Sequence, residues 1–205
     1  MPEEPVALVV YSDYLCPWCN VAAVRLRALA PEYGDRLVIT WRSFLLRPRP
    51  ERRTLDEFRA YTRSWLRPAA EEPTATFRVW STEEGPPTHS VPPHLAAKAA
   101  AQFGPDAFTR MHDALLDAYF VQNRDVTREA TLRALWSEVG LPDAAFDRLS
   151  DPAIADQVIA EHNDAVRSGI TSVPAAMLAG SDAAIPGALP MDVYRRWIDR
   201  ALAAR

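Results

Sequence analysis

The pattern of apolar and polar positions shows a strand, a helix and a second strand at the start of the chain. Residues 6–11 form a continuous apolar and β-branched run, which is typical of a buried parallel strand. Residues 20–30 carry apolar side chains three and four positions apart, and Pro31 and Gly34 mark the expected end of this helix. Residues 37–44 alternate as a second strand. The order predicts a βαβ unit with a right-handed crossover.

The middle of the chain has a mostly helical pattern, broken at proline and glycine residues. The helices that we expect cover residues 55–66, 93–103, 105–121, 128–139, 143–149 and 153–168. The segment 68–93 is rich in proline and has no clear helical pattern. Within it, residues 76–80 form a short run that is able to pair as a strand.

Strand patterns return after Gly169. Residues 175–178 and 183–185 predict two strands, and Ala179-Gly180-Ser181-Asp182 between them is typical of a hairpin turn. Residues 190–203 predict a last amphipathic helix.

The element order gives the fold class, which is α/β. A βαβ unit, a helical block and a ββα unit together predict a thioredoxin fold interrupted by a large all-helical insertion. We assign residues 1–53 and 169–205 to the thioredoxin-like domain and residues 54–168 to the insertion. The last helix of the insertion, about residues 153–168, should pack with the thioredoxin core.

Composition and charge exclude several other classes of protein. The 205 residues are 48% hydrophobic and carry a net charge of −4, which gives no reason to expect a nucleic-acid partner. No run of about 18 apolar residues predicts a membrane span. The first five residues lack the basic and apolar regions of a secretory signal. We therefore expect a cytoplasmic protein with no membrane partner, and its oligomeric state stays open.

Cys16 and Cys19 are the only cysteines, and they lie two residues apart between the first strand and the first helix. A lone C-x-x-C in this setting is typical of a thioredoxin-like redox centre. Cys16 at the helix N-cap would face unpaired N–H groups that stabilise a thiolate, and Pro17 suits the first helical position. We expect Cys16 to be the exposed nucleophile and Cys19 the buried resolving thiol.

Metal and haem sites fit the two cysteines poorly. No second cysteine pair or nearby histidine completes a zinc site, and Asn20 stands where haem attachment needs a histidine. We expect no metal and no organic cofactor. Trp18 is either an exposed aromatic side chain at a helix start or an apolar rim for substrate, and the second is favoured because it borders Cys16.

The motif Asp13-Tyr14-Leu15-Cys16-Pro17-Trp18-Cys19, the helical insertion and Gly169-Ile170-Thr171-Ser172-Val173-Pro174 resemble the DsbA-like thioredoxin superfamily, and most closely its FrnE-like branch of disulfide oxidoreductases. The resemblance implies that Pro174 follows a cis peptide bond and lies against the cysteine pair. It also implies that the backbone of Val173 binds an extended substrate as an added strand. Ser172, where the family often has glycine, puts substrate preference in doubt.

The function that we expect is thiol–disulfide exchange on protein or small-molecule substrates, with glutathione as a candidate co-substrate. The first alternative is a glutathione-dependent enzyme of the kappa-class transferase or 2-hydroxychromene-2-carboxylate isomerase type. Those proteins typically carry serine at the position of Cys16 and lack the resolving cysteine. The second alternative is a non-catalytic, chaperone-like binder. Direction, whether oxidase, reductase or isomerase, stays open because it depends on reduction potential.

Other polar and aromatic residues have ordinary structural interpretations. The arginines at positions 42, 47, 49, 52 and 53 predict a solvated loop in preference to an anion site. We expect Ser90 to cap a helix, whereas an approach of His89 or His94 to Cys16 stays open. Trp41 is expected to be a core anchor, like Trp136 and Trp197.

Overall fold

The computed structural model describes residues 4–181 and 183–204. Its strands are β1 (Val6–Ser12), β2 (Leu37–Ser43), β3 (Ala175–Leu178) and β4 (Ile185–Pro186). Its α-helices are α1 (Pro17–Tyr33), α2 (Leu55–Thr62), α3 (Leu66–Glu71), α4 (Val91–Ala101), α5 (Pro105–Phe120), α6 (Glu129–Glu138), α7 (Pro152–Arg167) and α8 (Met191–Ala203). Three short 3₁₀ helices cover Gly34–Arg36, Arg63–Trp65 and Asp143–Ser150.

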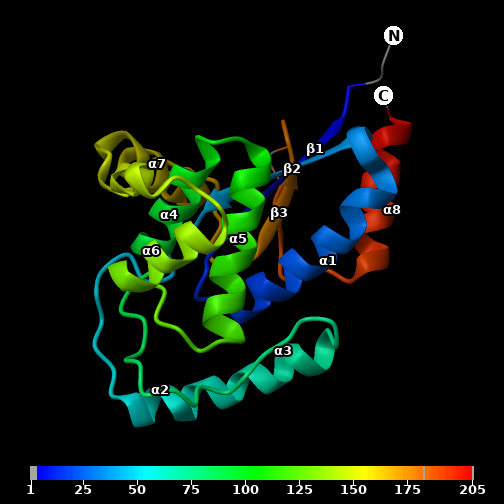
Figure 1. Ribbon diagram of the computed structural model, residues 1–205. Helices are drawn as coiled ribbons and strands as arrows, with labels where there is room; N and C mark the ends of the chain where they lie inside the picture. Colours follow the sequence, from blue (N-terminus) through cyan, green and yellow to red (C-terminus); the bar gives the residue numbers. More distant parts are fainter. Residues whose placement is uncertain (1–3, 182, 205) are drawn as a thin grey trace.

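The four strands form one sheet in the order β2-β1-β3-β4. β1 pairs parallel with β2, with Val10 opposite Trp41, and antiparallel with β3, with Val10 opposite Ala176. β4 adds antiparallel to β3. This is the sheet of a thioredoxin fold. Helices α2 to α7 form an insertion that lies between β2 and β3 in the sequence (Figure 1).

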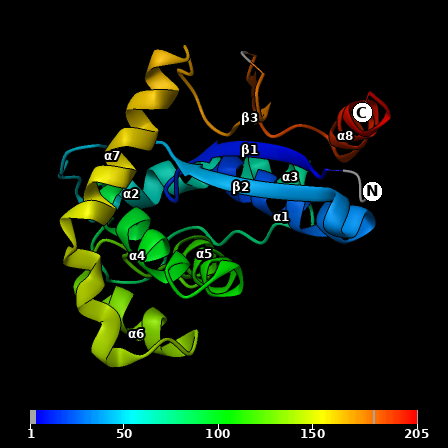
Figure 2. The ribbon, with the colours of Figure 1, turned by 90° about the horizontal axis from the view of Figure 1, so that it is seen from above.

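Both faces of the sheet are covered by helices. Leu8 and Val10 of β1 are fully buried against α1 and α8, which pack side by side on one face. Tyr11 and Ala175 lie on the other face, in a cluster with Ala165 of α7. Figure 2 shows α4, α5 and α6 on the β2 side of the sheet. Alternate residues of β1 therefore face different layers, as the pleat of a strand requires.

The insertion has its own aromatic core. Phe58 and Trp65 from the α2–α3 region pack with Tyr119 and Phe120 at the end of α5, and all four side chains are fully buried. Burial of a side chain such as Phe58 contributes about 1.5–3 kcal/mol. The same cluster includes Tyr14 and Leu15, which directly precede Cys16. The packing of the insertion thus supports the loop that carries the first cysteine.

Several expected helices differ from the structure. The helix expected over 93–103 covers Val91–Ala101, and the one expected over 143–149 is the 3₁₀ helix Asp143–Ser150. α1 ends at Tyr33 with Gly34 at its C-cap, as the sequence predicts, whereas Pro31 lies inside the helix. A proline in the last turn removes one hydrogen bond without breaking the remainder of the helix. The helix expected over 55–66 is instead two helices joined by the 3₁₀ turn Arg63–Trp65, and α3 continues into the proline-rich segment as far as Glu71.

The expected strand at residues 76–80 is wrong. Its backbone finds partners outside a sheet: Trp80 N donates to Thr62 Oγ1, and Arg78 N donates to the Phe120 carbonyl. The last strand covers Ile185–Pro186 instead of 183–185. Asp182 of the expected hairpin turn lies outside the described residues, as do the first three residues of the acidic N-terminus.

Candidate active site

Cys16 occupies the N-cap of α1, where strand β1 turns into the helix. Its backbone is extended, Pro17 takes the first helical position, and Cys16 Sγ accepts a hydrogen bond from Cys19 N at 3.4 Å. The sulfur therefore faces an N–H group of the first helical turn, and this end of the helix dipole stabilises negative charge.

The second contact of Cys16 comes from the loop before β3. Cys16 Sγ donates to the Val173 carbonyl at 3.4 Å, across 157 positions of sequence. The Val173–Pro174 peptide bond is cis, which confirms the expectation from the family resemblance. Cys16 is only 5% exposed, so the expectation of an exposed nucleophile is wrong for this structure, because the loop at Val173 covers the sulfur.

Cys19 lies one turn into the helix and is fully buried. Its Sγ accepts a hydrogen bond from Asp13 N at 3.4 Å. Burial, followed by the neighbouring Cys16 thiol, raises the pKa of the Cys19 thiol well above its ordinary value. Both cysteines are free thiols in this structure. The two sulfurs thus differ in setting: Cys16 Sγ accepts from a helix N–H and contacts the Val173 carbonyl, whereas Cys19 Sγ is fully buried beneath it in the first turn of the helix.

Asp13 holds the loop before Cys16, a role that the sequence analysis missed. Its carboxylate accepts from Leu15 N at 2.7 Å and from Leu46 N at 2.8 Å, so it ties the loop after β1 to the loop after β2. The side chain is fully buried, and burial raises its pKa although these hydrogen bonds oppose the rise. The available signal was an acidic residue directly after a buried strand, where an apolar residue is expected.

Trp18 lies between the cysteines and is half-buried. The guanidinium of Arg67, from α3, lies 5.9 Å from the centre of its ring. Trp18 therefore forms part of the surface beside Cys16, together with the short helix α3 of the insertion. Pro17 is half-buried and Pro174 is buried.

The sequence analysis left open whether His89 or His94 approaches Cys16. Among the described residues, neither histidine contacts Cys16. His94 Nε2 lies 3.9 Å from Asp13 Oδ2, and burial lowers the pKa of His94 to about 3, so this ring is neutral at neutral pH. His89 is half-buried and bonds to the neighbouring Thr88 hydroxyl. Ser90 stands at the N-cap of α4 without capping it, because its hydroxyl accepts from Arg47 N.

The remaining polar groups give the site no metal-binding cluster. Within residues 4–181 and 183–204, no group of three or more His, Cys, Asp or Glu side chains is placed to hold a metal ion. None of the helices described here is long and apolar enough to cross a membrane.

The arginine-rich loop after β2 is mostly exposed. Arg49, Arg52 and Arg53 are exposed there, whereas the side chain of Arg47 is mostly covered and lies 3.8 Å from Glu51. This loop is solvated, as its composition predicts.

Curated relatives match the chain to different extents. The sequence is 25% identical over 198 residues to the uncharacterised protein YwbO of Bacillus subtilis, a match that covers 94% of this chain and 96% of the relative. Na(+)/H(+) antiporter NhaA 1 sequences from three Mycobacterium strains are 39% identical over 59 residues. That match covers 29% of this chain and 10% of each antiporter.

Solved structures share the fold over nearly the whole chain. A putative protein disulfide isomerase from Nitrosomonas europaea has a TM-score of 0.85 at 18% identity, covering 98% of this chain and 100% of that one. The cytosolic disulfide reductase DsbM from Pseudomonas aeruginosa has a TM-score of 0.77 at 21% identity, covering 97% and 100%, and is also solved with GSH. A 2-hydroxychromene-2-carboxylate isomerase has a TM-score of 0.69 at 18% identity, covering 95% of both chains.

The sequence also matches the model of a protein family, and this match is consistent with the fold and the site described above. The description of that family is "DSBA-like thioredoxin domain", and the match extends over residues 7–199, which includes the sheet, the insertion and both cysteines. The chain belongs to the DSBA-like thioredoxin domain family.

Proposed function

We propose that this chain is a thiol–disulfide oxidoreductase that works through the Cys16–Cys19 dithiol, in the cytoplasm and within the FrnE-like branch of its family. The observation that carries the proposal is the position of Cys16 Sγ, between the N–H of Cys19 and the carbonyl of Val173. A sulfur at this position has a helix N-terminus on one side and, on the other, a backbone carbonyl with which an extended substrate would pair once its contact with Cys16 opens.

The exchange needs two sulfur–sulfur displacements. The Cys16 thiolate attacks one sulfur of a substrate disulfide, a Cys16–substrate bond forms, and the other substrate sulfur leaves as a thiolate that takes up a proton. Cys19 then gives up its proton and attacks Cys16 Sγ, which releases the second substrate thiol. The substrate gains two electrons and the dithiol loses two. The same steps in reverse oxidise a substrate dithiol.

Substrate binding in this proposal uses the backbone of Val173 and the surface of Trp18. An extended peptide that pairs with Val173 brings its disulfide to Cys16, since Val173 O already lies 3.4 Å from the sulfur. Access requires the contact between Cys16 and Val173 to open, because Cys16 is 5% exposed. Trp18, with Arg67 against its ring, would contact the apolar part of the substrate.

Glutathione is the co-substrate that we propose. Its thiol and its disulfide are the groups that the exchange needs, and the structure of DsbM, a protein with a similar fold, has been solved with GSH. The likeness to the isomerase concerns the fold alone. The presence of Cys19 favours dithiol exchange over an isomerase or transferase reaction, because a reaction that only activates glutathione has no use for a resolving thiol.

A trapping experiment tests the proposal. Cys19→Ser removes the resolving thiol, so the mixed disulfide with a disulfide-bonded peptide should persist on Cys16, as measured by intact-protein mass spectrometry. Cys16→Ser is the matched control and should form no adduct. An adduct on Cys19, or no adduct in either variant, would contradict the proposal.

A further inference from the structure

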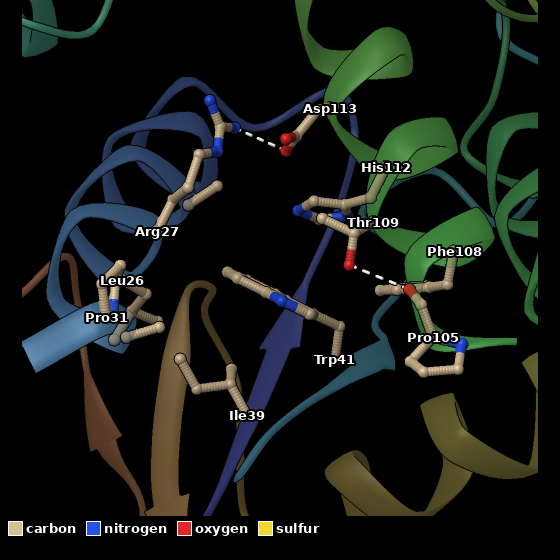
Figure 3. Close-up of a pocket in the computed structure, with 12 residues that line it drawn as sticks. Leu26, Arg27, Pro31, Ile39, Trp41, Pro105, Phe108, Thr109, His112 and Asp113 are labelled. Carbon is tan, nitrogen blue, oxygen red and sulfur yellow. Dashed lines mark hydrogen bonds and ion pairs between the residues drawn. The ribbon is translucent and has the colours of Figure 1, made fainter. Parts of the chain in front are cut away.

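A cavity of about 310 Å³ lies between α1, β2 and α5, separate from the cysteine pair. Figure 3 shows its walls, which are mostly apolar: Leu26 on α1, Ile39 and Trp41 on β2, and Phe108 on α5. Its volume is at the lower end of the roughly 300–1,000 Å³ of small-molecule sites. Trp41 is thus only partly a core residue, because its ring also forms one wall of this cavity.

His112 lines this cavity and carries an unpaired polar atom. The side chain is buried and its ring lies 4.6 Å from the Trp41 ring and 5.5 Å from the Phe108 ring, centre to centre. Its Nδ1 bonds to the Tyr14 hydroxyl at 3.0 Å, whereas its buried Nε2 has no hydrogen-bond partner among residues 4–181 and 183–204. In Figure 3 the ring extends from α5 toward the space between Arg27 and Trp41.

The protonation of this pair makes Nε2 a donor. Burial lowers the pKa of His112 to about 3, so the ring is neutral at neutral pH. Burial also raises the pKa of Tyr14 well above its ordinary value, so its hydroxyl keeps its proton. Among the described residues this buried hydroxyl bonds to His112 Nδ1, and its proton is satisfied only when it donates to that nitrogen. The ring proton of His112 is then on Nε2. A buried donor without an acceptor is unfavourable, and an acceptor atom in the cavity would relieve it.

The charges at the cavity compensate one another. Arg27 Nη2 and Asp113 Oδ1, which both line it, form an ion pair at 2.5 Å. With His112 neutral, Arg27 and Asp113 are the charged side chains among the lining residues, and their charges cancel. An anionic ligand would face the Asp113 carboxylate, and a cationic ligand would face the Arg27 guanidinium, so the cavity favours an uncharged ligand.

We propose that this cavity binds an uncharged, flat compound of one or two rings whose carbonyl oxygen accepts a hydrogen bond from His112 Nε2. The rings would lie between the side chains of Leu26, Ile39, Trp41 and Phe108. The inference is independent of the dithiol chemistry, because neither cysteine lines the cavity.

Three matched probes test the inference by NMR titration of the ¹⁵N-labelled protein: 1-indanone, indane without the oxygen, and indane-1-carboxylate. We expect saturable shifts at residues of α1, β2 and α5, with 1-indanone binding about three- to tenfold more tightly than indane. The carboxylate should bind more weakly than the ketone. Equal binding of ketone and indane, tightest binding of the carboxylate, or no saturable shifts at these residues would overturn the inference.

Variants locate the site. Thr109→Trp places a large ring at the cavity from an exposed position and should abolish 1-indanone binding, whereas Ala160→Trp, exposed on α7, should leave it unchanged. His112→Phe keeps an aromatic ring and should bind ketone and indane equally. Should His112→Phe fail to fold by circular dichroism, the comparison of ketone and indane on the unmodified protein still decides. Unchanged binding in Thr109→Trp would place the ligand elsewhere and contradict the inference.

Discussion

At the scale of single residues, the site depends on a few buried polar groups whose partners lie far away in sequence. Cys16 and Cys19 were predictable, because a C-x-x-C between a strand and a helix is visible in one short stretch. The hydrogen bonds of Asp13 to Leu46, and of Tyr14 to His112, were not predictable, because no local pattern indicates which distant group fills a buried space. Side-chain polarity alone did not separate Tyr14 and His112 from ordinary loop and helix positions, whereas Asp13 stood out as an acidic residue directly after a buried strand.

The buried histidines make stability depend on pH. Because the pKa of His94 is about 3 in the folded chain and about 6.5 when unfolded, the unfolded chain binds a proton first as the pH falls. The stabilisation is complete above about pH 6.5 and is lost as the pH falls toward 3. His94→Gln should reduce the slope of unfolding free energy against pH by about 1.4 kcal/mol per pH unit between about pH 6 and 4.

Urea unfolding at a series of pH values measures this slope. His89→Gln is the matched control, since His89 is half-buried and its pKa is lowered less. An unchanged slope in His94→Gln would show that this ring becomes protonated in the folded protein at its ordinary pH.

At the scale of elements, strands and long helices follow the sequence pattern, whereas short connections do not. Local periodicity and capping residues were enough to predict β1, β2 and α1. The segment around Trp80 was harder to predict. Its residues favour a strand, but they are buried in the core of the insertion and do not pair in a sheet. α3 is held in place by tertiary contacts that periodicity does not contain, above all those of Arg25.

Arg25 joins three elements through one buried guanidinium. Its Nε bonds to Glu72 Oε2 at 2.9 Å, and its other nitrogens bond to the carbonyls of Glu71, Ala188 and Leu189. The ion pair is largely covered, with side chains 10% and 15% exposed. Removing one partner of such a pair leaves the other charge uncompensated, so Arg25→Met should lower the free energy of unfolding by about 3 kcal/mol.

Urea denaturation measures this loss. Arg27→Met, two positions along the same helix, is the control: its ion pair with Asp113 is much more exposed and should contribute less than about 1 kcal/mol. Equal effects of the two substitutions would contradict a special role for the Arg25 contacts.

At the scale of the whole molecule, the insertion and the sheet form one connected structure. Lys98 of α4 bonds to Glu161 of α7 at 2.7 Å and to the carbonyl of Trp41 in β2, and Glu161 also accepts from Ser43 N. The order of elements predicted the fold, because βαβ and ββα units leave few ways to complete the sheet. This buried ion pair could not be predicted, since its partners are 63 positions apart and look like ordinary surface residues.

The central claim is that Cys16 and Cys19 act together as a reversible two-electron couple, and equilibration with glutathione tests it most directly. The protein is held at a series of ratios of reduced to oxidised glutathione, quenched with acid and weighed by mass spectrometry. We expect one reversible transition between the dithiol and an intramolecular disulfide, and a lasting glutathione adduct in Cys19→Ser. A protein that stays a dithiol at every ratio, or that stops at a glutathione adduct with Cys19 intact, would contradict the account.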